Sequence, residues 1–179
     1  MRIVAEQNMV ARYESKFVEV GRSPDGWTAT FVDPTTDERW QRIYLGSEYH
    51  GGGMPILLKE PMPSVDELLS MAADSLDSAE LAASAWLLAD QDLEGRYKDR
   101  LVAIAEELSI QGHHARAALV VAWGDLMSDM NLRPTLGKSD ADITKDHAHF
   151  CAIAARARML LQIGRTDQFP RDPAVFGHR

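Results

Sequence analysis

The spacing of apolar and polar residues divides this chain into two parts with different periods. Up to about residue 60 the pattern alternates, and Trp27, Ala29 and Phe31 fall on one face of a predicted strand. Beyond residue 63 the apolar residues recur every three or four positions, as in the stripe over residues 101–108. The first part is therefore predicted to form a sheet and the second to form helices.

Turn residues set the limits of the predicted strands. Ser23-Pro24-Asp25-Gly26 predicts a tight turn, because proline presets φ and glycine tolerates a positive one. Asp33-Pro34 begins a second turn of the same kind. The residues before, between and after these turns predict an antiparallel meander, whereas residues 2–14 fit a strand or a helix equally well. The predicted strands cover residues 16–22, 27–32, 39–45 and 54–59.

Pro61-Met62-Pro63 marks the boundary, since two prolines cannot continue a ladder or a helix interior. We therefore expect a sheet domain over residues 1–60 and a helical domain over residues 61–179. About five helices follow, and Ser64 with Glu67 has the spacing of a capping box. Asp77 and Asp140 are the other predicted caps, and Gly164 is the predicted end of the last helix.

The predicted fold class is α+β: a small antiparallel β-meander followed by an α-helical bundle or by short HEAT-like helical hairpins. Residues 82–108 are the segment that most resembles such a hairpin. The aromatic residues are assigned to the two cores rather than to a ligand cage. They are Phe17, Trp27, Phe31, Trp40 and Tyr44 in the sheet, and Trp86 and Trp123 in the helices.

Composition and charge narrow the function. The net charge is −8, and residues 61–110 alone carry 11 acidic and 3 basic side chains. Nucleic-acid binders carry a basic footprint, so this class is not expected, whereas an acidic surface can attract a basic protein. A single cysteine excludes an intrachain disulfide, and no signal peptide or membrane span is evident. We expect a cytoplasmic protein with no membrane attachment.

The glycine-rich segment between two predicted strands is the strongest local signal. Three consecutive glycines suit a loop whose backbone takes positive φ or lies close to a partner. The predicted partner-binding residues are Glu48, Tyr49, His50, Gly51, Gly52 and Gly53.

Catalytic chemistry is less well supported. Glu48 and His50 could act as an acid–base pair or as two metal ligands, but no third ligand or nucleophile lies nearby. The chain has no Gly-x-Ser-x-Gly elbow, so an esterase oxyanion loop is not expected. His147 and Cys151 are predicted to lie on the buried face of the last helix. We predict no catalytic residue, no cofactor and no metal.

Several of these segments together resemble the bacterial family called immunity protein 27. The resemblance covers roughly residues 24–60: a tryptophan strand, an Asp-Pro turn, an aromatic strand at Arg39-Trp40, and then Ser-Glu-x-His-Gly-Gly-Gly-x-Pro over residues 47–55. Members of that family are small cytoplasmic antidotes that neutralise toxins of competing bacteria. The resemblance implies a protein partner, in this case a basic toxin domain.

Three hypotheses follow. The first is a non-enzymatic protein-binding inhibitor of the immunity type. The second is a helical-repeat scaffold or self-associating module in which the glycine loop is only a turn. The third is a small hydrolase or metal enzyme that uses Glu48 and His50. The pattern leaves the oligomeric state and the identity of the partner open.

Overall fold

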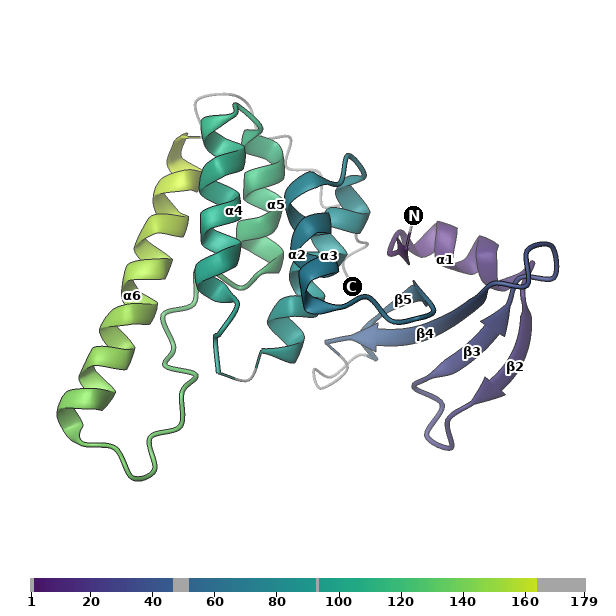
Figure 1. Ribbon diagram of the computed structural model, residues 1–179, viewed down its shortest axis with the longest axis horizontal. Helices are drawn as coiled ribbons and strands as arrows, with labels where there is room; N and C mark the ends of the chain where they lie inside the picture. Colours follow the sequence, from purple (N-terminus) through teal and green to yellow (C-terminus); the bar gives the residue numbers. More distant parts are fainter. Residues whose placement is uncertain (1, 47–51, 93, 164–179) are drawn as a thin grey trace. The chain divides into compact units, whose positions relative to one another are not determined.

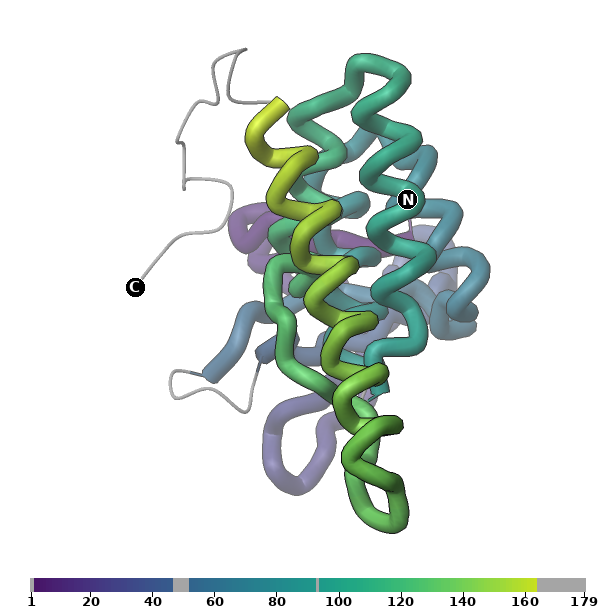
Figure 2. The backbone as a smooth tube through the Cα atoms, turned by 90° about the vertical axis from the view of Figure 1, so that its left-hand side faces the viewer, coloured from purple at the N-terminus to yellow at the C-terminus, as the bar shows by residue number. Residues whose placement is uncertain are grey.

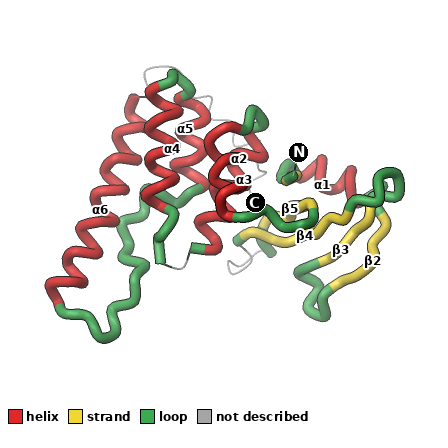
Figure 3. Tube along the Cα trace, viewed as in Figure 1, coloured by secondary structure: helices red, strands yellow, loops and turns green. Residues whose placement is uncertain are grey.

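The computed structural model describes residues 2–46, 52–92 and 94–163, and it has an α+β fold (Figure 1). The chain forms two compact units, and the division falls within one helix, between Leu68 and Leu69. All of the described strands belong to the first unit, the sheet unit, as Figure 3 shows in yellow. The second, the helical unit, contains four whole helices and most of a fifth among its described residues.

The sheet unit is built on a five-stranded antiparallel sheet of order β1-β5-β4-β3-β2. The meander predicted from the sequence is confirmed, and its last two strands have the predicted limits. A short N-terminal strand that the sequence did not resolve pairs with β5 at the edge. The strands are β1 (Ile3–Val4), β2 (Val18–Arg22), β3 (Ala29–Val32), β4 (Arg39–Leu45) and β5 (Met54–Lys59).

Helix α1 (Gln7–Glu14) covers one face of this sheet (Figure 1). Residues 2–14, which fitted a strand or a helix equally well, thus contain both a strand and a helix. Phe31 and Trp40 pair across β3 and β4, and both are buried beneath the helix. Directly opposed aromatic residues on one face stabilise a sheet through their side chains. Val10 of α1 and Leu57 of β5 complete this core with Val4 and Ala29.

Helix α5 (His114–Trp123) is the central element of the helical unit, because α3, α4 and α6 all pack against it. The tube in Figure 2 shows α6 beside α4 and α5. Helix α3 packs mainly on α5 rather than on α4, so the predicted hairpin over residues 82–108 is wrong and a bundle describes the unit better. The other helices are α2 (Val65–Asp74), α3 (Ser78–Gln91), α4 (Lys98–Ile110) and α6 (Asp140–Ile163).

Side-chain caps fix where these helices begin. The Ser64 amide donates to Glu67 Oε2 at 2.8 Å, and the Glu67 amide donates to Ser64 Oγ at 3.3 Å, which is the predicted capping box. Asp77 accepts from the amides of the second and third residues after it, as predicted. The last helix differs: Ser139, not Asp140, is its cap, since Ser139 Oγ accepts from the Asp142 amide at 3.2 Å. Gly164 lies outside the described residues.

The inward face of α6 also differs from the prediction. His147 is exposed and Cys151 is half-buried, and their Nε2 and Sγ atoms lie 3.5 Å apart. Asp146 is buried in their place, where Arg133 and Lys138 form ion pairs with it at 2.7 and 2.5 Å. A charge that is paired on both oxygens can be buried at much lower cost than an unpaired one.

Candidate recognition site at one end of the sheet

The glycine-rich segment lies between β4 and β5 in the sequence. Pairing between these two strands continues to Leu45 and Met54, and the described residues next to this last pair are Gly46, Gly52 and Gly53. Four of the predicted partner-binding residues, Glu48, Tyr49, His50 and Gly51, lie outside the described residues. The other two, Gly52 and Gly53, are described.

The backbone at this hairpin end requires glycine. Gly46, Gly52 and Gly53 have φ values of 65°, 91° and 70°, in the region that side chains with a Cβ rarely adopt. A Cβ added at Gly52 would meet no atom within 4 Å, so the requirement comes from conformation and not from crowding. The expectation of positive φ is confirmed at Gly52 and Gly53. Gly53 is exposed, which leaves its backbone accessible to a partner.

The topology brings a second loop to the same end of the sheet. In an antiparallel meander, the β2–β3 turn and the β4–β5 hairpin end lie on the same side. The turn at residues 23–28 is fixed by hydrogen bonds: the Ser23 amide donates to Thr28 O at 2.8 Å, and the Thr28 amide donates to Ser23 Oγ at 2.9 Å. Asp25 Oδ1 accepts from the Trp27 amide at 3.0 Å. These hydrogen bonds therefore fix the backbone of the turn at Trp27.

Trp27 and Tyr44 form an aromatic contact between the two hairpins. Their ring centroids are 5.3 Å apart with an interplanar angle of 88°, the edge-to-face geometry that aromatic pairs prefer. Trp27 is 42% exposed and Tyr44 is half-buried, so the prediction that both belong to the sheet core is wrong. Trp27 lies in the turn rather than in β3, and it follows Gly26, whose φ is 79°. The sequence did contain a signal for this placement, because Trp27 directly follows a Pro-Asp-Gly turn and so is expected in the turn rather than in the strand.

Arg42 supports the aromatic pair from behind. Its side chain is only 10% exposed, and its guanidinium lies 5.2 Å from the Tyr44 ring and 5.9 Å from the Phe31 ring. Arg42 Nη1 donates to Glu14 Oε1 of α1 at 3.0 Å. A buried cation that is neutralised by a carboxylate and faces two rings is held in place by several contacts at once. We refer to Trp27, Tyr44 and Arg42 as the aromatic ledge.

Two carboxyl groups near the ledge have pKa values below their usual range. The hydroxyl of Ser23 and the amide of Trp27 lower the pKa of Asp25. Arg22 lowers the pKa of Glu19, first by hydrogen bonding and then by its charge, and Arg42 contributes less. General acids and bases instead have pKa values shifted toward neutrality. The lowered pKa values of these two carboxyl groups thus lack that shift.

The described histidines all belong to the helical unit. His113 and His114 precede and begin α5, and His147 and His149 lie on α6. No group of three or more potential metal ligands occurs among the residues that the structure describes. None of the helices in the described ranges is both long and apolar enough to cross a membrane.

No protein-family model, curated protein or solved structure matches this chain.

Proposed function

We propose that this chain is a non-enzymatic protein-binding inhibitor of the immunity type, and that it binds its partner through the end of the sheet. The observation that carries the proposal is the aromatic ledge: an exposed tryptophan held rigidly by a hydrogen-bonded turn, a tyrosine and a buried arginine. Tryptophan, tyrosine and arginine are the residues that most often dominate the binding energy of protein interfaces. A rigid side chain also loses little conformational entropy when a partner covers it.

The glycine-rich hairpin end would form the second half of this surface. Residues 24–60, the segment that resembles immunity protein 27, contain both the aromatic ledge and the glycine-rich residues. Glu48 and His50 are the side chains of the hairpin that we expect to contact the partner, and Gly51, Gly52 and Gly53 would let its backbone approach closely. A basic toxin domain remains the proposed partner, because the acidic residues of the chain favour its association electrostatically.

Co-expression with a toxin tests this function. A toxin gene next to the gene for this protein supplies the candidate partner. We expect the wild type to restore growth, and Trp27→Ala to lose at least tenfold in toxin affinity, because truncation of a central tryptophan costs roughly 2 kcal/mol or more. Leu76→Ala is the matched control, since Leu76 is 91% exposed and lies in the helical unit. Failure of the wild type to bind the toxin would refute the proposal.

A helical scaffold is the second candidate, and one observation favours it. Several large apolar side chains of the helical unit are exposed, among them Ile110 at 80% and Leu136 at 97%. Exposed apolar residues mark an interaction surface where they form a contiguous patch. If Ile110→Ser abolishes partner binding while Trp27→Ala and His50→Ala leave it unchanged, the scaffold replaces the inhibitor as the better function.

A further inference from the structure

A hollow along the flank of α1 is separate from the aromatic ledge. Its volume is about 180 Å³, and the described residues that line it are Met9, Arg12, Tyr13 and Lys16. These four positions follow the i, i+3, i+4, i+7 spacing of a single helical stripe. The amides of Lys16 and Phe17 both donate to Tyr13 O at 2.9 Å, so the chain still turns helically where Lys16 is placed.

One wall of the hollow is rigid and apolar. The Tyr13 ring lies 6.1 Å from the Trp40 ring in a stacked arrangement and 5.3 Å from the Phe17 ring, and Met9 packs against the same core. The half-buried Tyr13 and Met9 side chains thus present apolar surface to the hollow without needing to move. A preformed apolar wall of this kind is the usual binding surface for the body of a small molecule.

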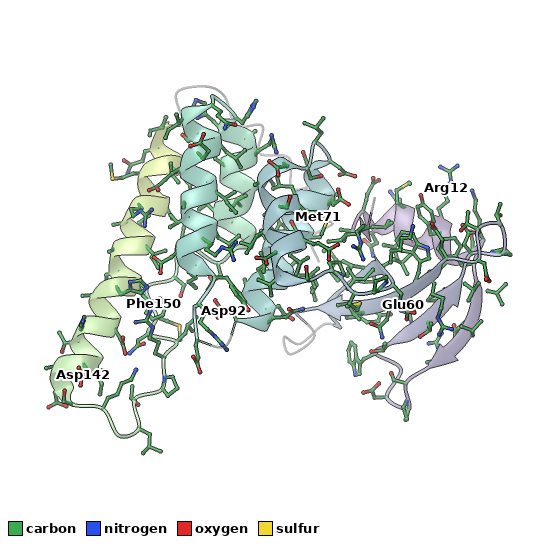
Figure 4. All side chains as sticks on the ribbon, in the orientation of Figure 1. Arg12, Glu60, Met71, Asp92, Asp142 and Phe150 are labelled. Carbon is green, nitrogen blue, oxygen red and sulfur yellow. The ribbon has the colours of Figure 1, made fainter. Side chains whose placement is uncertain are left out.

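The other lining groups are two exposed cations. Neither Arg12 nor Lys16 forms an ion pair with any residue that the structure describes. Glu14, which lies between them in sequence, is bonded to Arg42 instead. In Figure 4 the Arg12 side chain projects from α1 on the side away from the sheet. The local charge at the hollow is therefore positive, although the chain as a whole carries −8.

We propose that this hollow binds a small organic anion, going beyond the function proposed above. Arg12 and Lys16 hold a carboxylate or phosphate head, while a ring or short alkyl body lies against Tyr13 and Met9. The volume matches that of roughly six water molecules, which suits a ring-sized ligand and not a peptide segment. Arginine and lysine are the side chains best suited to an anionic head.

Phenyl phosphate is the probe, and the ¹³C-labelled methyl group of Met9 is the reporter. We expect the Met9 signal to shift and saturate with a Kd roughly in the millimolar range, as for other ligands of this size. The exposed Met159 of α6 serves as an internal control and is expected not to move. The double variant R12Q/K16Q should weaken binding about tenfold, since each exposed charge contributes modestly. Lys145→Gln, which removes an exposed lysine of α6, should leave the Kd unchanged.

Two further probes separate the head from the body. Inorganic phosphate and benzyl alcohol should each bind at least fivefold more weakly than phenyl phosphate. The proposal is overturned if Met9 does not respond at low salt, if inorganic phosphate binds as tightly as phenyl phosphate, or if R12Q/K16Q retains the wild-type Kd. Unchanged signals elsewhere in the spectrum will show that the double variant is folded.

Discussion

The sheet unit and the helical unit bury different kinds of side chain. The core of the sheet unit contains Phe31 and Trp40, with the rings of Tyr13 and Phe17 packed against it. The helical unit instead buries many alanines among its leucines and valines. These alanines are Ala72, Ala82, Ala83, Ala85, Ala105, Ala117, Ala118, Ala154 and Ala157. Small side chains let helix backbones approach closely, whereas large rings on a sheet provide broad, stiff surfaces.

This difference explains where a recognition surface can form. In the sheet unit, the aromatic layer continues beyond the core to Trp27, which is exposed but still held by its neighbours. The described ion pairs of the helical unit instead serve mainly to hold its own segments together, as Asp146 does for the loop before α6. The two units should therefore respond differently to substitution, and four experiments can test that contrast.

The largest effect is expected in the sheet core. Trp40→Ala should lower the free energy of unfolding of the sheet unit by about 3–5 kcal/mol, because it removes a buried ring and leaves a cavity. Amide hydrogen exchange measures the two units separately. Protection should fall in β3 and β4, and an equal loss in α4 and α5 would contradict an effect confined to the sheet unit.

The corresponding experiment in the helical unit is Gly95→Ala, which adds a side-chain carbon to a packed site instead of removing a ring from one. A Cβ at Gly95 would lie 2.4 and 2.7 Å from two ring carbons of the buried Phe150, and the φ of Gly95 is 69°. We expect Gly95→Ala to cost about 2–4 kcal/mol, from the overlap together with the backbone strain. Thermal unfolding and hydrogen exchange in α6 measure this cost.

Gly112→Ala is the control for that substitution. Gly112 has a φ of 81°, but a Cβ there would meet nothing within 4 Å. Its cost should be only about 1 kcal/mol, from strain alone. Equal costs at the two positions would show that contact with Phe150 does not matter.

The ion pairs of Asp146 predict a dependence on pH. Hydrogen bonds from Lys138 and Arg133, and then their charges, lower the pKa of Asp146 in the folded state. A depressed carboxyl pKa stabilises the fold above the unfolded value of about 4, and this contribution is lost as the pH falls through the folded value. Asp146→Asn should therefore be less stable than the wild type at pH 7, and the two should converge on acidification. A difference that stays constant between pH 7 and pH 2 would exclude this origin.

The smallest effect is expected at a helix cap. Asp77 Oδ1 accepts from the Ala79 and Glu80 amides at 2.8 and 3.3 Å. Asp77→Ala should cost about 1 kcal/mol, and Asp77→Asn should recover most of that loss. Chemical denaturation of both variants measures the cap, and no difference between alanine and asparagine would argue against it.

Local patterns in the sequence predicted the elements well. Alternation and turn residues located β4 and β5 at their observed limits, and the Ser64–Glu67 capping box was predicted from spacing alone. These features depend on neighbouring residues, whose influence a sequence shows directly. The positive φ of Gly52 and Gly53 was predictable for the same reason.

Features that depend on distant residues were not predictable. The pairing of α3 with α5 instead of α4 depends on tertiary packing, and the burial of Asp146 depends on cations 8 and 13 positions away. Likewise, Trp27 meets Tyr44 only because two hairpins end on the same side of the sheet. Of the candidate site, the sequence predicted the glycine hairpin but missed the aromatic ledge beside it.

The stacked indoles of Trp86 and Trp123, one from α3 and one from α5, offer an optical probe of the helical unit. Their centroids are 4.9 Å apart and their planes differ by 28°. Two identical chromophores this close and slightly rotated couple their electronic transitions, which produces a paired positive and negative band in circular dichroism. Loss of that doublet during heating would report separation of α3 from α5 without any added dye.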